Sequence, residues 1–168
     1  MKFQFTKSVM FVFCAIAYFF AGITQSAAQN KYTTSLREAA ENFAKAEDNR
    51  DVMAMLAAID SNFSITFRGE TEKTGLVGFS EMTSQMFSDS TRILKMVYDI
   101  KEVKAGSTEP VWAGYDRGTF TQTENSKDGQ YHRKVSGPYF RAWKLVNGQW
   151  KCYQATFMAF MCEGNDCK

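Results

Sequence analysis

The chain has 168 residues, of which 45% are hydrophobic and 23% are charged. These fractions are close to globular averages and exclude a disordered or collagen-like chain. The formal net charge is +2 and no basic run or stripe is present, so no nucleic-acid partner is expected. The length allows one ordinary domain and a short additional segment.

The N-terminal segment has the pattern of a secretory signal peptide. Lys2 and Lys7 precede an apolar run over residues 9–23, which is shorter than the ~20 residues that a membrane-spanning helix needs. Small residues at 26–28 provide a cleavage site after Ala28. An uncleaved N-terminal anchor is the alternative. We expect an exported protein, periplasmic or secreted, with no stable membrane span after signal removal: a signal peptide (1–28), one domain (29–160) and a tail (161–168).

Disulfide bonds are expected in an exported chain, because it meets an oxidising compartment. Cys162 and Cys167 enclose a short polar loop that contains Gly164, and we predict a local disulfide between them. Cys152 would then be unpaired in a strand; the alternative is a bond between Cys152 and one of the tail cysteines. No metal site is expected, since the single histidine, His132, is distant in sequence and zinc usually takes four ligands.

The front of the domain is predicted to be helical. Between residues 35 and 48, apolar residues recur at three- and four-residue steps, as in an amphipathic helix, and Ser35 with Glu38 has the spacing of a capping box. Asp51 can cap a second helix that reaches Ile59. An alternating strand is predicted over 63–67, a glycine-punctuated turn region over 69–75, and a short helix over 79–87.

The chain after residue 91 is predicted to form strands and hairpins, over 93–103, 111–123, 131–146 and 150–160. Asn147-Gly148 is the strongest hairpin signal, and an interruption or a bulge is expected at Gly137-Pro138. Helices followed by long antiparallel strands predict an α+β fold. Long bulged strands predict a strongly bent sheet that wraps the helices and leaves a hollow for a small ligand at one end.

Several stretches of the second half are similar to those of a known superfamily. They are residues 112–120 (WAGYDRGTF), 137–139 (GPY), Trp143, and 147–151 (NGQWK). Over about residues 35–158, the chain resembles the SnoaL-like, ketosteroid-isomerase-like branch of the nuclear-transport-factor-2-like superfamily. The resemblance implies a cone of helices on a curved antiparallel sheet, a pocket at its open end, and dimers formed through the sheet. Because that superfamily holds isomerases, dehydratases, cyclases, hydrolases and domains without catalysis, the fold does not fix the function.

The last strand departs from the family pattern at two polar positions. Relatives often have an aspartate and an asparagine where this chain has Ala155 and Met158. Apolar residues at two pocket positions would remove acid–base capacity, which favours binding without catalysis. Motifs for nucleotide hydrolysis, serine-esterase chemistry and paired-cysteine redox exchange are missing from the sequence, and no cofactor is expected.

An isomerase-type mechanism would need a carboxylate base and hydrogen-bond donors at the developing oxyanion. Asp60 can equally cap a turn, and Asp116 can equally form a cross-strand ion pair with Arg133 or Arg141. The candidate bases are Asp60, Asp99 and Asp116, and the candidate donors are Tyr98, Tyr115, Tyr139 and Tyr153.

The expected ligand-binding residues come mainly from the last strands. Tyr139, Arg141 and Trp143 share one face, because they are two residues apart. An arginine between two aromatic rings can hold a carboxylate ligand, or it can lie on the outer face with its stem covering the rings. In the last strand we place Tyr153 and Phe157 toward the hollow, although one bulge would reverse this face. The full set is Trp112, Tyr139, Arg141, Trp143, Tyr153 and Phe157.

The sequence therefore predicts an exported domain that binds a small apolar or amphipathic molecule without catalysis and forms a homodimer. The first alternative is an isomerase- or dehydratase-type enzyme that uses a pocket aspartate as base and a tyrosine as donor. The second alternative is a protein-interaction module whose cone is filled by its own side chains. A carboxylate inside the pocket would separate the first two functions.

Overall fold

A computed structural model describes residues 31–67, 69–106, 111–158 and 161–167. The predicted signal peptide and most of the predicted turn over 106–110 lie outside these residues. Among the described residues, no helix combines the length and the apolar character that a membrane span requires. A helix covers 31–48 and is followed by α2 (Val52–Ala58), β1 (Ile59–Phe67), β2 (Glu70–Lys73), α3 (Gly75–Ser88), β3 (Arg92–Ala105), β4 (Ala113–Ser126), β5 (His132–Val146), β6 (Gln149–Phe157) and β7 (Met161–Gly164).

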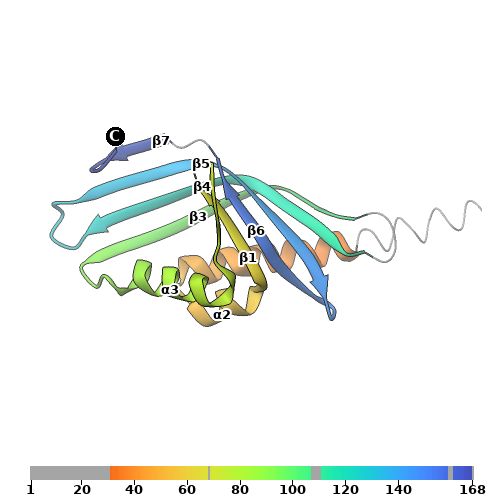
Figure 1. The fold of residues 1–168 in the computed structure, drawn as a ribbon. Coiled ribbons are helices and arrows are strands. Elements are labelled where there is room, and N and C mark those ends of the chain that lie inside the picture. Colours follow the sequence, from red (N-terminus) through yellow and green to blue (C-terminus); the bar gives the residue numbers. More distant parts are fainter. Residues whose placement is uncertain (1–30, 68, 107–110, 159–160, 168) are drawn as a thin grey trace, which may run out of the picture.

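The strands form one sheet in the order β2-β1-β6-β5-β4-β3, and β7 pairs with β5. Neighbouring strands are antiparallel except β1 and β6, which are parallel. The sheet curves, and the N-terminal helix, α2 and α3 all lie on the same side of it (Figure 1). The predicted α+β class, with helices packed on a curved and mostly antiparallel sheet, is confirmed.

Among the described helices, α2 begins at a side-chain cap, whereas α3 has no such cap at Thr74. Asp51 Oδ1 accepts a hydrogen bond from Ala54 N at 3.0 Å, so the predicted cap of α2 is confirmed. The predicted capping box at Ser35 is wrong, because residues 31–34 are already helical. The Ser35 hydroxyl instead donates to Tyr32 O and accepts from Trp150 Nε1 at 3.0 Å, which ties the first helix to β6.

The region over 69–75 is not only a turn, because β2 pairs antiparallel with β1 from Ser64↔Lys73 to Phe67↔Glu70. The sequence of β2, Glu-Thr-Glu-Lys, has no apolar alternation that would signal a strand. The next helix, α3, begins at Gly75, earlier than predicted.

The bulges also differ from the prediction. Between β4 and β5 the register runs without a break through Thr119↔Pro138, and β5 is one continuous strand, so the expected interruption or bulge at Gly137-Pro138 is wrong. At that place β5 changes its partner on the other edge, from β7 over 133–136 to β6 from 139 onward. The register shift lies between β5 and β6, where Ala142 pairs with Gln154 and Trp143 pairs with Cys152, which leaves Tyr153 as the extra residue.

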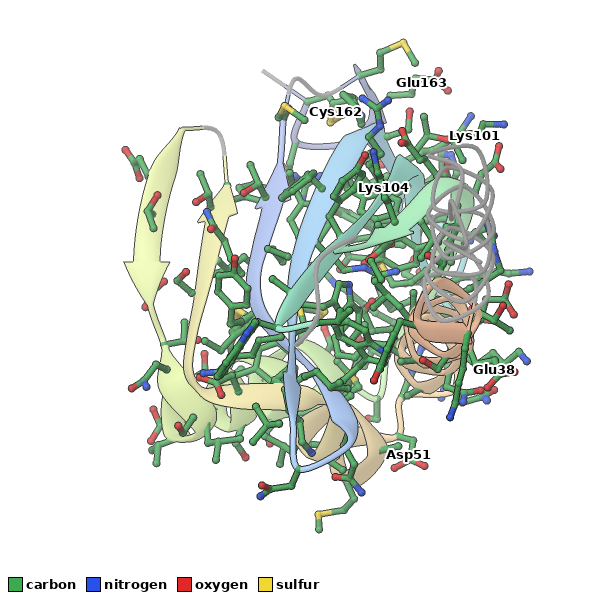
Figure 2. All side chains as sticks on the ribbon, turned by 90° about the vertical axis from the view of Figure 1, so that its right-hand side faces the viewer. Glu38, Asp51, Lys101, Lys104, Cys162 and Glu163 are labelled. Carbon is green, nitrogen blue, oxygen red and sulfur yellow. A yellow bond between two sulfur atoms is a disulfide. The ribbon has the colours of Figure 1, made fainter. Side chains whose placement is uncertain are left out.

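The C-terminal tail pairs with the sheet through β7, and a disulfide bond closes a short loop within it. A disulfide joins Cys162 and Cys167, whose Cα atoms are 5.4 Å apart, which confirms the predicted local pairing. Cys152 is free and buried. Figure 2 shows Cys162 and Glu163 at the top of the view and Asp51, which caps α2, near its lower end. In this view the disulfide lies at the opposite end of the molecule from the start of α2.

Candidate functional site

A cavity of about 290 Å³ lies between the helices and the inner face of the sheet. This volume is at the small end of the range for ligand pockets. The walls are mainly phenylalanine and methionine side chains, which tolerate ligands of varied shape. The apolar lining consists of Phe43, Met55, Phe63, Ile65, Phe67, Phe79, Met82, Met86, Phe87, Met96, Phe120, Ala155 and Phe157.

A fully buried ion pair supports one wall of the cavity. The β4–β5 register places Asp116 opposite Arg141, and the carboxylate accepts hydrogen bonds from Arg141 Nε at 3.0 Å and Nη2 at 2.7 Å. Tyr139 and Trp143 lie two residues to either side of Arg141 on β5. Their Oη and Nε1 atoms donate to Asp116 at 2.8 Å and 2.6 Å. The carboxylate is thus fully engaged, as the ion-pair alternative for Asp116 predicted.

The guanidinium of Arg141 is enclosed by aromatic rings. Its Cζ atom lies 5.3 Å from the ring centroid of Phe43, 4.9 Å from Tyr98 and 4.9 Å from Tyr139. Burial opposes its charge, but the carboxylate of Asp116 outweighs this effect and raises the pKa of Arg141 above its usual value. Arg141 therefore stays a cation, and it lines the cavity.

One nitrogen of this guanidinium remains available. Nε and Nη2 face Asp116, and Nη2 also donates to Ala40 O at 3.4 Å. Because the group is planar, Nη1 points away from Asp116. Nη1 is buried and has no hydrogen-bond partner among the described residues. Arg141 therefore has, beside the cavity, two N–H donors without an acceptor among the described residues.

Glu47, near the end of the first helix, also lines the cavity. Its Oε2 atom is shielded from solvent and has no hydrogen-bond partner in the described part of the chain. Burial raises the pKa of Glu47 to about 7, against the opposing charge of Arg141 and the nearby Tyr98 hydroxyl. Position 47 continues the spacing of Leu36, Ala40 and Phe43, which could have indicated an inward carboxylate, yet the sequence analysis did not single it out.

Tyr98 on β3 is the third polar side chain on this side of the cavity, whose lining also includes Glu72, Thr83 and Gln122. Its ring packs edge-on against Tyr139, with centroids 5.0 Å apart. Its hydroxyl lies near the Glu47 carboxyl and interacts with it, but makes no hydrogen bond of regular geometry within the described segments. Burial, together with the charge of Glu47, raises the pKa of Tyr98 well above its usual value, so the hydroxyl keeps its proton. Tyr98 was among the donors expected from sequence.

The predicted ligand-binding residues are divided by the structure between the cavity and other places. Arg141 and Phe157 line the cavity, whereas Tyr139 and Trp143 hold Asp116 in place. Trp112 and Tyr153 line a groove on the surface instead, and the Trp112 side chain is 71% exposed. Tyr153 is turned outward by the bulge in β6, which is the reversal that one extra residue causes.

The other two predicted bases are also held away from the cavity. Asp99 forms an ion pair with Lys101 on the exposed face of β3, with Nζ and Oδ2 2.5 Å apart. Asp60 lies in the surface groove, where Lys144 Nζ is 2.8 Å from Oδ2 and Asn62 N donates to Oδ1. Burial acts to raise the pKa of Asp60, but these hydrogen bonds and the charge of Lys144 outweigh it and lower the pKa.

Comparison with known proteins identifies the architecture. No family model and no curated protein matches the chain. A ketosteroid isomerase-like protein from Erwinia carotovora atroseptica is 18% identical, aligned over 77% of this chain and 96% of that one, with a TM-score of 0.64. A proposed scytalone dehydratase from Novosphingobium aromaticivorans is 9% identical over 85% and 93%, with a TM-score of 0.69.

A nuclear-transport-factor-2-like protein of unknown function from Shewanella oneidensis is 13% identical, aligned over 76% of this chain and 98% of that chain, with a TM-score of 0.60. At these identities the likeness concerns the fold. The chain has the cone fold of nuclear-transport-factor-2-like proteins, as the sequence resemblance predicted.

Proposed function

We propose that this chain, with its nuclear-transport-factor-2-like fold, binds a small apolar or amphipathic molecule inside the cone. One observation carries the proposal: an apolar cavity of about 290 Å³ in which a few polar atoms are gathered. Ligand sites commonly combine apolar walls with a small number of polar groups that orient the ligand. The open cavity argues against the interaction module, whose own side chains would occupy this space.

Native mass spectrometry of the protein, expressed from the full-length sequence in a bacterial host and purified after export, tests this proposal. We expect one bound small molecule, either carried through purification or acquired from added octanol. Ala155→Phe fills the cavity from β6 and should abolish binding, whereas Ala54→Phe, at an exposed position of α2, should not. Equal binding by the wild type and Ala155→Phe would contradict the proposal.

A second candidate function is acid–base catalysis of the isomerase or dehydratase type. It is favoured by Glu47, which lines the cavity with a pKa of about 7 and lies beside Tyr98. The base would then be Glu47, in place of the three aspartates expected from sequence. Deuterium exchange at the α-carbon of tetralone, followed by NMR in D₂O, tests it. Exchange that is lost in Glu47→Gln would support the enzyme, and exchange that is unchanged would contradict it.

We further propose that the protein is exported and dimeric. Residues 1–28 have the pattern of a signal peptide, and a disulfide in the tail suits an oxidising compartment. Ile93 and Val97, on the outward side of β3, are 49% and 48% exposed and offer an apolar surface for pairing through the sheet. The N-terminal sequence of the purified protein should begin at Gln29, and a sequence that begins at Met1 would contradict the cleavage of a signal peptide. Sedimentation should give the mass of a dimer, and the mass of a monomer would contradict pairing through the sheet.

A further inference from the structure

Three buried polar atoms without hydrogen-bond partners among the described residues belong to residues that line the cavity: Arg141 Nη1, Tyr98 Oη and Glu47 Oε2. They come from three elements far apart in sequence: the first helix, β3 and β5. A buried polar atom left without a partner costs free energy comparable to a lost hydrogen bond. A group of three such atoms in an apolar cavity therefore indicates where the polar end of a ligand belongs.

The chemistry of these atoms is biased toward donors. Nη1 carries two N–H groups and the Tyr98 hydroxyl carries one O–H. Protonated Glu47 adds another O–H, and Arg141 contributes a permanent positive charge that would repel a cationic ligand. The complementary ligand group is one that only accepts hydrogen bonds and accepts several of them.

We propose that the cavity takes a small amphipathic monocarboxylic acid, whose carboxylate accepts hydrogen bonds from Arg141 Nη1, the Tyr98 hydroxyl and a protonated Glu47. This inference rests on the proposed function and names its ligand class. An ionised carboxylate only accepts, at about four lone-pair positions on two oxygens, which matches the donors present. A hydroxyl group would leave several of these donors unsatisfied. The hydrocarbon part would lie against the phenylalanine and methionine side chains.

Binding of such an acid is coupled to a proton on Glu47. Asp116 already balances the charge of Arg141, so the cavity is close to neutral when Glu47 is protonated and negative when it is ionised. A carboxylate brought next to ionised Glu47 is repelled, and it therefore raises the affinity of Glu47 for a proton. Binding above pH ~7 should take up one proton, since Glu47 is largely ionised there in the free protein.

The other titratable groups around Glu47 do not change this expectation. Tyr98 on β3, Tyr139 on β5 and the Cys152 thiol on β6 keep their protons, because burial raises the pKa of each. Arg141 on β5 remains charged and Asp116 on β4 is paired with it. Glu72 on β2 is at the exposed rim of the cavity, where its charge is screened by solvent. Glu47 is the group whose protonation responds to the ligand near neutral pH.

Calorimetric titration of the purified protein with octanoic acid and with octanol tests the inference. Each titration is made at about pH 6 and pH 8 in two buffers of different ionisation enthalpy, which counts the protons taken up. We expect the acid to bind at least ~10-fold more tightly than the alcohol at pH 6, because it satisfies charge-assisted hydrogen bonds. Its dissociation constant should rise by up to ~10-fold per pH unit above pH 7, with uptake approaching one proton.

Two variants of cavity residues and one control variant test whether Glu47 and Tyr98 contact the bound acid. Glu47→Gln keeps a donor but does not titrate, so it should bind the acid with no proton uptake and no pH dependence. Tyr98→Phe should weaken acid binding by ~10-fold or more and octanol binding much less. Glu41→Gln changes an exposed carboxylate on the same helix and should behave like the wild type.

The outcomes distinguish this inference from the proposed function. If both compounds bind with similar affinity and without proton uptake, or only the alcohol binds, the carboxylate inference is overturned and the binding function stands. If neither compound binds, both are contradicted. Acid binding that takes up a proton equally in Glu47→Gln would also overturn the inference, because the proton would then reside elsewhere.

Discussion

Asp116 and Arg141 form a buried ion pair that holds four side chains of β4 and β5 in one network. The pair could be predicted from sequence as one of two alternatives, since both residues lie in adjacent strands. The additional donors could not, because alternation along β5 says only that Tyr139, Arg141 and Trp143 share a face. That all three converge on one carboxylate depends on the exact register Asp116↔Arg141.

Asp116→Asn should destabilise the protein by about 3–5 kcal/mol, because it leaves the charge of Arg141 buried and uncompensated. Urea denaturation at neutral pH measures this loss. The double variant Asp116→Leu, Arg141→Met should recover part of it, since two apolar residues remove both buried charges but leave Tyr139 Oη and Trp143 Nε1 without their acceptor. Glu102→Gln breaks the exposed ion pair with Arg117 and serves as the control, with little change expected. A negligible loss in Asp116→Asn would contradict the role given to the pair.

Glu47 should make the stability of the fold depend on pH in an unusual direction for a carboxyl group. Its pKa is about 7 in the folded protein and 4.5 in the reference state, so folding takes up a proton between these values. Its contribution to stability is therefore greatest at low pH and falls as pH rises through this window, by at most ~1.4 kcal/mol per pH unit. Relative to the wild type, Glu47→Gln should be more stable at about pH 8 than at about pH 5. Parallel pH profiles of the two proteins would contradict the burial of Glu47.

At the scale of elements, the hydrophobic pattern of the sequence predicts most helices and strands, but it does not predict the register shifts between paired strands. The alternation of Tyr153, Ala155 and Phe157 places them on one face, and the structure keeps only Ala155 and Phe157 in the cavity. A bulge adds one residue without leaving a mark in the hydrophobic pattern, so the face of Tyr153 could not be fixed. The strand β2 could not be predicted for a different reason, because its four residues include no apolar side chain.

A second irregularity, in β3, explains a glycine in β4. The register between these strands shifts between Ile100 and Glu102, and Gly118 lies so close to β3 that a Cβ atom would be 2.0 Å from Asp99 O. Gly118→Ala should therefore force the two strands apart and cost about 1–3 kcal/mol. Thermal unfolding measures this cost. Thr119→Ala, at the exposed neighbouring position, is the control; equal stability of the two variants would contradict the close approach.

At the scale of the whole molecule, the cone and its hollow follow from long strands placed after helices, and both could be predicted. The composition of the hollow could not, because its residues come from every layer: the first helix, α2, α3 and six strands. Glu47 shows why, since a carboxylate on a helix is usually read as solvent-facing. Position 47 becomes an interior position only because β3 and β5 pack against the first helix.

The central claim is that a ligand binds inside the cone, and the methionine methyl groups report on it directly. Met55, Met82, Met86 and Met96 line the cavity, whereas the exposed residues Met53, Met158 and Met161 lie elsewhere. With ¹³C-methyl methionine and stepwise addition of octanoic acid, NMR should show shifts for the four cavity methyls and unchanged signals for the three exposed ones. Shifts confined to the exposed methyls, or no shifts at all, would contradict the account.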